Sequence, residues 1–296
     1  MTGRRAILEV LVDDAGISPA LTGLCAGYEL GEWRRSALAK TMFYSLPEFA
    51  LSPSEAADFT SGTGVEMLSR AVKNIYLTDR YHRRGEFGEL LLHVVLREVF
   101  HTEIAISKIF FKDSHNDTVK GFDAVHVIAD PSGKLELWLG EVKFYDNLAR
   151  AIRDVVAELH AHVDSDYLRS EFAAIGGKID SSWAHAEEMR QLIANEVSLD
   201  EIFDNLTIPV LLTYDSRVVA DRVLELSKDL NVPPSATAEA YRTAFEDEIR
   251  AGWSRFTGAG LPQRVRIRLI LVPLHEKRTL LSDLHERLKA WQQATA

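Results

Sequence analysis

The segment GFDAVHVIADPSGKLELWLGEVKFY, residues 121–145, decides the fold. Polar and apolar residues alternate along its first ten positions, a pattern typical of a strand with one buried face. Pro131, Ser132 and Gly133 form a short turn, and the run 135–145 predicts a second strand. We therefore expect an antiparallel hairpin. In its first strand, Asp123 points to one face of the sheet and the other face carries Phe122, Ala124, His126 and Ile128.

The sequence on both sides of this hairpin predicts alternating helices and strands. A strongly apolar helix at 87–100 (FGELLLHVVLREVF) precedes it, and an amphipathic helix at 147–163 follows it. The remaining expected elements are strands at 104–111, 208–214 and 265–272, a helical insert at about 165–205, and a C-terminal helix at about 278–292. This order predicts an α/β fold in which a mixed β-sheet is flanked by helices.

The N-terminal part is less regular. Residues 7–12 (ILEVLV) predict a strand, and two or three helices follow it. We divide the chain into an N-terminal α/β region at 1–80, packed on the core, and a core at 81–296 that carries the helical insert. Cys25 is the single cysteine, which fits a reducing cytoplasm, and no apolar run is long enough to span a membrane.

Three charged residues of the hairpin form the candidate site. Glu141 and Lys143 are two positions apart in one strand, so both side chains point to the same face. The turn brings Asp123 of the neighbouring strand close to Glu141. Two adjacent carboxylates repel each other unless a cation lies between them, and hard oxygen ligands suit Mg²⁺ or Mn²⁺. Lys143 can orient a metal-bound water, help to deprotonate it, or offset charge on a phosphate.

A further carboxylate from the preceding helix is expected to complete the metal site. Glu89 lies deep in the apolar run, and Glu86 lies one turn earlier, where a carboxylate also favours the helix dipole. We prefer Glu89 as the third ligand beside Asp123 and Glu141. The choice between Glu86 and Glu89 stays open.

Simpler interpretations compete with this one. A Glu-x-Lys tripeptide arises by chance about once in a chain of this length, so Glu141 and Lys143 can also be a surface pair at a sheet edge. His160 and His162 are two apart on a helix and cannot share a metal ion, and Glu158 is assigned to a face away from the apolar stripe. His93 and His126 are interpreted as core histidines.

The net charge of −10 argues against a free-standing nucleic-acid-binding protein, because affinity for phosphate comes from clustered Lys and Arg. If the protein acts on nucleic acid, we expect either that its basic residues are concentrated around one cleft or that a partner subunit brings the nucleic acid. The candidate phosphate contacts are Arg80, Arg83 and Arg84, with His82 beside them, and a second group of Arg264, Arg266 and Arg268. Each group is equally well explained as a solvated face.

The motifs GEFGELLLH, GFDAVHVI and LWLGEVKFY together resemble the PD-(D/E)xK nuclease superfamily, and more narrowly the HamA family of the Hachiman anti-phage defence system. The resemblance covers most of the chain and is strongest from Arg83 to Phe172. It implies a restriction-endonuclease-like core and a Mg²⁺-dependent DNA endonuclease. It also implies a superfamily 2 helicase subunit (HamB-like) as the partner that holds the nuclease in check. One departure is that the superfamily's Pro-Asp is Phe122-Asp123 here.

Two other functions compete with a nuclease. One is a non-catalytic, protein-binding subunit with a nuclease-like fold, which the acidic charge suits. The other is an enzyme that uses the carboxylates for acid–base chemistry on a small molecule. The intact Asp123, Glu141 and Lys143 argue against the first, and the absence of a cofactor fingerprint argues mildly against the second.

Overall fold

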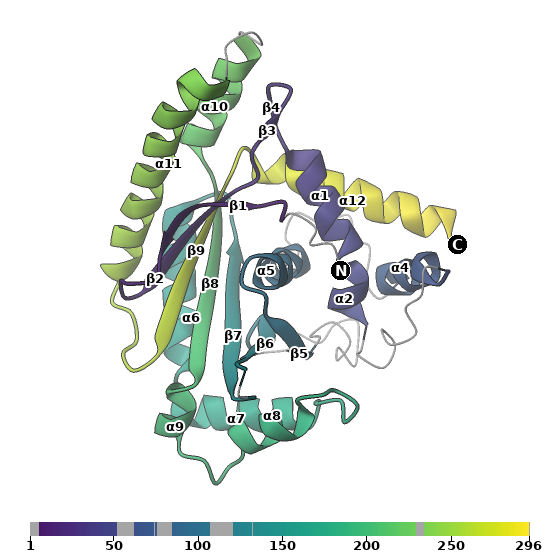
Figure 1. Cartoon of the computed structure of the whole chain (residues 1–296), viewed down its shortest axis with the longest axis vertical. Coiled ribbons are helices and arrows are strands. Elements are labelled where there is room, and N and C mark those ends of the chain that lie inside the picture. Colours follow the sequence, from purple (N-terminus) through teal and green to yellow (C-terminus); the bar gives the residue numbers. More distant parts are fainter. Residues whose placement is uncertain are drawn as a thin grey trace.

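A seven-stranded mixed sheet forms the centre of the molecule (Figure 1). The computed structural model describes residues 6–51, 62–73, 75, 85–106, 121–131, 133–228 and 234–295. The strand order is β1-β2-β9-β8-β7-β6-β5, and a separate hairpin is formed by β3 and β4. The strands are β1 Glu9–Asp14, β2 Ala20–Cys25, β3 Tyr28–Glu29, β4 Glu32–Trp33, β5 Glu103–Ile106, β6 Ala124–Ala129, β7 Leu135–Phe144, β8 Leu206–Asp215 and β9 Arg266–Leu274.

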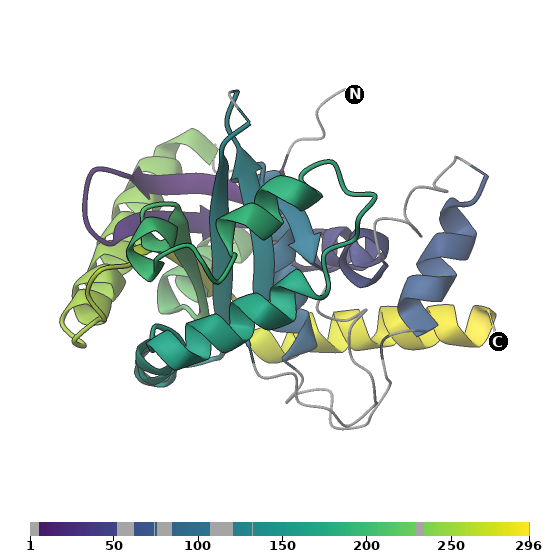
Figure 2. The ribbon, with the colours of Figure 1, turned by 90° about the horizontal axis from the view of Figure 1, so that it is seen from below.

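Helices cover both faces of this sheet, as Figures 1 and 2 show. On one face lie α1 Arg35–Tyr44, α2 Leu46–Ala50, α4 Gly64–Lys73, α5 Glu86–Glu98 and α12 Lys277–Ala294. On the other lie α6 Leu148–His162 and α11 Pro234–Thr257, with α10 Arg217–Lys228 beside α11. The insert consists of α7 Ser165–Gly176, α8 Ala186–Leu192 and α9 Leu199–Phe203, at one end of the sheet.

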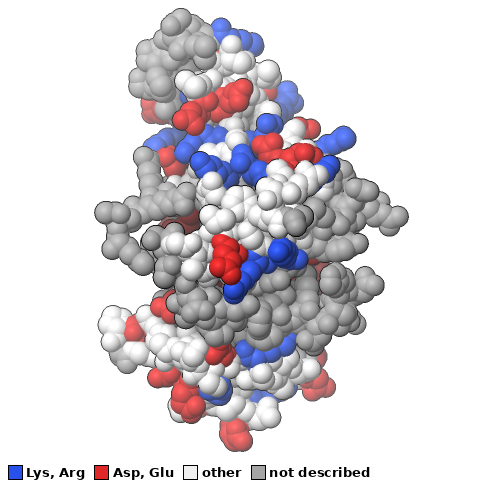
Figure 3. Space-filling view, turned by 90° about the vertical axis from the view of Figure 1, so that its right-hand side faces the viewer, with Lys and Arg blue, Asp and Glu red and all other residues white. Residues whose placement is uncertain are grey.

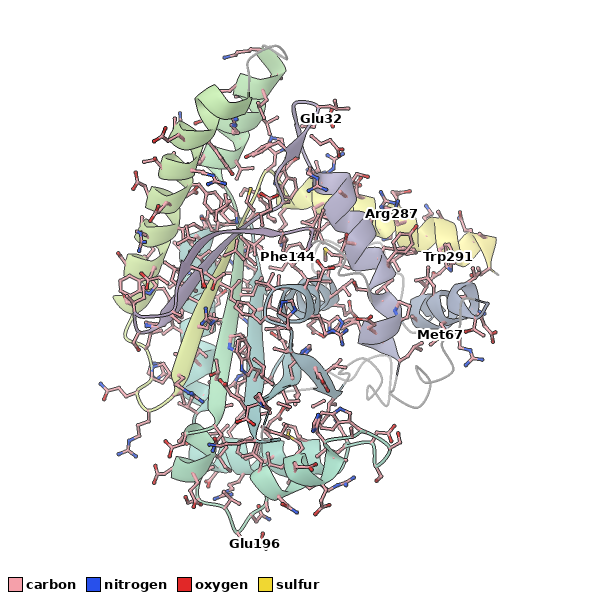
Figure 4. The ribbon with its side chains drawn as sticks, in the orientation of Figure 1. Glu32, Met67, Phe144, Glu196, Arg287 and Trp291 are labelled. Carbon is pink, nitrogen blue, oxygen red and sulfur yellow. The ribbon has the colours of Figure 1, made fainter. Side chains whose placement is uncertain are left out.

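The two faces of the sheet bury separate hydrophobic clusters. Val142 and Phe144 of β7 pack with α5 in one cluster, and Phe144 is labelled in Figure 4. Met67 of α4 and Trp291 of α12 extend this cluster away from the sheet (Figure 4). On the other face, Leu139 of β7 packs in the second cluster with apolar residues of α6 and α11. The expected α/β fold with a mixed sheet between helices is confirmed.

The central hairpin forms as predicted. β6 and β7 pair antiparallel, with Ala124 opposite Gly140 and Val127 opposite Leu137. Gly133 has φ +86°, a backbone conformation that favours glycine, and its N–H donates to the carbonyl of Asp130. One part of the expected alternation is wrong: Phe122 packs with Val125 and Val127 rather than with Ala124. Strand β6 begins only at Ala124, so the strand alternation does not determine to which face the side chain of Phe122 points.

The remaining expected elements are found close to their predicted bounds. β7, α6 and β8 follow one another as the predicted β–α–β succession, and β7 and β8 are adjacent and parallel. β9 pairs parallel with β8 and continues the parallel part of the sheet. The insert is helical, and α12 closes the described chain. β5 is described only to Ile106, and residues 107–111 of the predicted strand lie outside the described residues. The strands β2, β3 and β4, which come before the predicted N-terminal helices, were not predicted, and neither were the helices α10 and α11.

The N-terminal residues contribute strands to the main sheet. β1 pairs antiparallel with β2, and β2 pairs parallel with β9. The region at 1–80 therefore extends the sheet of the core in addition to supplying helices on it, and the boundary near residue 80 falls among residues 76–84, which are not described. No helix among the described residues is long and apolar enough to cross a membrane.

Two core histidines link α5 to the hairpin. His93 and His126 are each 1% exposed, and His93 Nδ1 lies 3.4 Å from His126 Nε2. Thr102 Oγ1 lies 2.7 Å from His126 Nδ1 and completes the chain of contacts. Burial lowers the pKa of His93 to about 3, with repulsion from Arg97 adding to the effect, and burial also lowers the pKa of His126. The interpretation of both residues as core histidines is confirmed.

We predict that this pair makes the protein sensitive to mild acid. Below the ordinary histidine pKa of about 6.5, the unfolded chain binds protons that the folded chain excludes, so the free energy of unfolding decreases as the pH falls towards about 3. Each histidine contributes a loss of about 1.4 kcal/mol between about pH 7.5 and about pH 5.5. Urea unfolding at the two pH values measures this loss for the wild type and for His93→Gln. Equal losses in the two proteins would contradict the prediction.

A second prediction concerns the close approach of α5 to β7 at Gly88. A Cβ at this position would lie 2.9 Å from Phe144 Cβ and 3.4 Å from Val142. The clash costs about 1–3 kcal/mol and outweighs the gain in helix propensity of up to about 1 kcal/mol, so Gly88→Ala lowers the free energy of unfolding. The matched control is Gly176→Ala in α7, where the nearest atom is 3.9 Å away. Chemical denaturation of both variants checks the difference, and a stabilised Gly88→Ala would refute it.

Candidate functional site

Glu141 and Lys143 project together from β7 toward α6, as their spacing predicts. Glu141 contacts His162 and Lys143 contacts Glu158, both on α6. Val142, between them, packs on the opposite face with α5. β7 lies between β6 and β8 in the interior of the sheet, so the alternative of a surface pair at a sheet edge is wrong. Glu141 is 1% exposed and Lys143 is 9% exposed.

Asp123 lies directly before β6 rather than within it, but it is fixed to β7 by two hydrogen bonds. Its backbone N–H donates to the carbonyl of Gly140 over 2.8 Å, and its Oδ2 accepts from the N–H of Val142 over 3.0 Å. These bonds hold the carboxylate against the peptide between Glu141 and Val142. Asp123 is therefore held beside the backbone of Glu141, and its negative charge contributes to raising the pKa of Glu141.

The Glu141 carboxylate is buried beside an imidazole. Glu141 Oε1 lies 2.6 Å from His162 Nδ1, but neither atom has an aligned hydrogen-bond partner, so the approach is a charge contact. Burial raises the pKa of Glu141 to about 7, and repulsion from Asp123 adds to this, against the attraction of His162 and Lys143. Burial lowers the pKa of His162, but the contact and charge of Glu141, with further nearby carboxylates, raise it above its ordinary value overall.

Two aromatic rings fix the orientation of His162. The Tyr167 ring stacks on it with centroids 4.6 Å apart and an interplanar angle of 12°. The Phe122 ring lies 4.9 Å away at 59°. These contacts come from α7 and from the segment before β6, so three separate parts of the chain meet around the imidazole.

Lys143 is paired with a carboxylate outside the predicted set. Its Nζ contacts an oxygen of Glu158. Burial lowers the pKa of Lys143, but the hydrogen bond and charge of Glu158, together with the charges of Asp123 and Glu141, raise it above its ordinary value overall. Lys143 is therefore held as a cation in this arrangement, which suits stabilisation of negative charge better than acceptance of a proton.

The contacts between β7 and α6 repeat in register, and we call them the α6–β7 ladder. Its rungs are the contact of Glu141 with His162 and the contact of Lys143 with Glu158. The strand residues are two apart, a step of about 6.7 Å, and the helix residues are four apart, a step of about 6 Å. Because the two steps nearly match and α6 runs antiparallel to β7, successive strand side chains meet successive turns of the helix.

The helix residues of the ladder were missed from the sequence. Glu158 was assigned to a face away from the core, and His162 was considered only together with His160. The signal was the four-residue spacing of Asp154, Glu158 and His162, a polar stripe beside the apolar one on the helix that follows the Glu-x-Lys strand. His160 instead contacts the carbonyl of Gly260, away from the site.

Glu89 is buried on α5, on the opposite side of the sheet from the α6–β7 ladder. Among the described residues, no group of three His, Cys, Asp or Glu side chains lies close enough together to hold a metal ion. The predicted set of Asp123, Glu141 and Glu89 is therefore not assembled in this conformation. The roles of Glu89 and Glu86 stay predictions.

Two carboxylates nonetheless fit a Mg²⁺ ion. This ion commonly binds proteins through one or two carboxylates and keeps several of its waters. Asp123 and Glu141 supply hard oxygen atoms at the same part of β7, and Glu141 Oε1 is a buried oxygen without an aligned donor. No hydrogen bond to the second oxygen, Oε2, is found among the described residues. The donor chemistry therefore suits Mg²⁺ or Mn²⁺.

The candidate phosphate contacts are only partly tested. Arg80, Arg83 and Arg84, with His82, lie outside the described residues. Arg266 donates to the carbonyls of Leu206 and Asp204, and Arg268 pairs with Asp13, so both side chains are engaged within the protein. On the face shown in Figure 3, basic and acidic side chains are interspersed over the described residues.

Comparison with known proteins identifies the family. A family model described as HamA matches residues 5–288, nearly the whole chain. No curated protein matches the chain. Because the match extends over the hairpin, α6 and the sheet that holds them, the chain belongs to the HamA family, the family of the Hachiman defence system.

Proposed function

We propose that the chain is a Mg²⁺-dependent DNA nuclease that acts as the effector of its defence system, with Mn²⁺ as a possible substitute metal. The observation that carries this proposal is that Glu141 and Lys143 lie on one face of β7, while the N–H of Val142 between them holds the carboxylate of Asp123. A buried carboxylate with a second, partly buried carboxylate and a cationic lysine beside it is costly to the fold, so it calls for a functional explanation.

The residues divide the work of phosphodiester hydrolysis as follows. Asp123 and Glu141 would hold the cation through their carboxylate oxygens. When bound, Mg²⁺ supplies Lewis acidity and lowers the pKa of a coordinated water. Lys143, held as a cation by Glu158, offsets the negative charge that develops on the phosphate.

We further propose that a helicase subunit brings the DNA and restrains the nuclease. The net charge of −10 opposes unaided binding of a polyanion. The described arginines Arg266 and Arg268 are occupied by contacts within the chain, so they do not supply a phosphate grip in this conformation. The family resemblance implies a superfamily 2 helicase of the HamB type. A non-catalytic subunit with a nuclease-like fold is the competing function.

A cleavage assay separates these two functions. Supercoiled plasmid and a matched RNA are incubated with the purified chain and with its co-purified complex, in Mg²⁺, in Mn²⁺ and in EDTA. We expect metal-dependent DNA cleavage that falls at least about 100-fold in Glu141→Gln and in Lys143→Ala, because each loses a group that stabilises the transition state. The matched control is Lys134→Ala, an exposed lysine at the start of the same hairpin strand, which keeps full activity.

Metal-dependent cleavage that survives both site substitutions would refute the assignment of the active site. Intact substrate under every condition, for the complex as well as for the chain, would favour the non-catalytic function.

A further inference from the structure

The position of His162 is explained neither by packing alone nor by the three proposed catalytic residues. Its side chain is 13% exposed, and its Nδ1 is fully buried against Glu141 Oε1 at 2.6 Å. Imidazole that only fills space does not need to face a buried carboxylate. Here the ring packs against both Tyr167 and Phe122, and its Nδ1 lies against Oε1 of Glu141.

The two oxygens of Glu141 have different surroundings. Oε1 is sealed from solvent and lies against His162. No hydrogen bond to Oε2 is found among the described residues, so Oε2 is the oxygen left for a ligand. A carboxylate whose first oxygen is restrained cannot rotate freely, and its second oxygen then keeps one direction.

We propose that His162 is a positioning residue of the metal site, which holds Oε1 of Glu141 so that Oε2 is presented to the cation beside Asp123. This inference rests on the proposed function, since it concerns the same metal. The α6–β7 ladder supplies the mechanism: α6 is also anchored to β7 by the contact of Lys143 with Glu158, so His162 stays in register with Glu141. Residues that orient metal ligands in this way typically contribute 10- to 100-fold to metal affinity.

An opposing role would give the opposite result. If His162 instead competes with the metal ion for the carboxylate of Glu141, removal of the imidazole strengthens metal binding. The direction of the change in affinity therefore decides between orientation and blockage, and it can be measured without any DNA cleavage.

The test is the affinity of the full-length, EDTA-stripped chain for Mn²⁺, measured by the loss of the free-ion EPR signal. His162→Phe keeps an aromatic ring against Tyr167 and removes the nitrogen, so we expect Mn²⁺ binding weakened about 10- to 100-fold. His162→Asn restores a nitrogen near the position of Nδ1, and we expect it to recover most of the affinity. His160→Phe, two positions along α6 and away from the site, is the matched control and leaves the affinity unchanged.

The possible results separate this inference from the proposed function. Circular dichroism first confirms that each variant is folded. If His162→Phe does not fold, the Mn²⁺ affinity of His162→Asn is compared with that of the wild type instead. Unchanged or tighter binding in the His162 variants, with binding abolished in Glu141→Gln, would overturn the role of His162 alone. Absence of Mn²⁺ binding by the wild-type chain would overturn both proposals.

Discussion

The burial of one carboxylate organises this part of the molecule. Glu141 is 1% exposed in an interior strand, and an uncompensated charge there costs several kcal/mol. The chain surrounds it with Lys143 two residues along the strand and with His162 on α6, while Asp123 adds a second carboxylate. Cations from the protein balance only part of this charge. The arrangement is therefore explained if a metal ion completes the balance.

The fold around this carboxylate could largely be predicted because its signals are local. The period-two alternation and the turn at Gly133 predicted the hairpin, and the i, i+2 spacing placed Glu141 and Lys143 on one face. The apolar stripe of residues 148–159 predicted α6. Phe122 was assigned to the wrong face because regular pairing begins two residues later, at Ala124.

The contacts of the site could not be predicted in the same way. Which turn of α6 meets which residue of β7 depends on how the helix is placed on the sheet, and this follows from packing in the second hydrophobic cluster. Glu158 and His162 were therefore missed although their spacing is visible in the sequence. The engagement of Arg266 and Arg268 within the protein likewise depends on partners distant in sequence, such as Asp13 and Asp204.

The central claim is that Asp123 and Glu141 bind a divalent cation together. The most direct measurement is anomalous X-ray scattering from crystals of the full chain soaked with Mn²⁺, beside crystals of Glu141→Gln treated identically. We expect one strong peak within coordination distance of both carboxylates in the wild type and no peak there in the variant. A Mn²⁺ peak elsewhere, or one unchanged by Glu141→Gln, would contradict it.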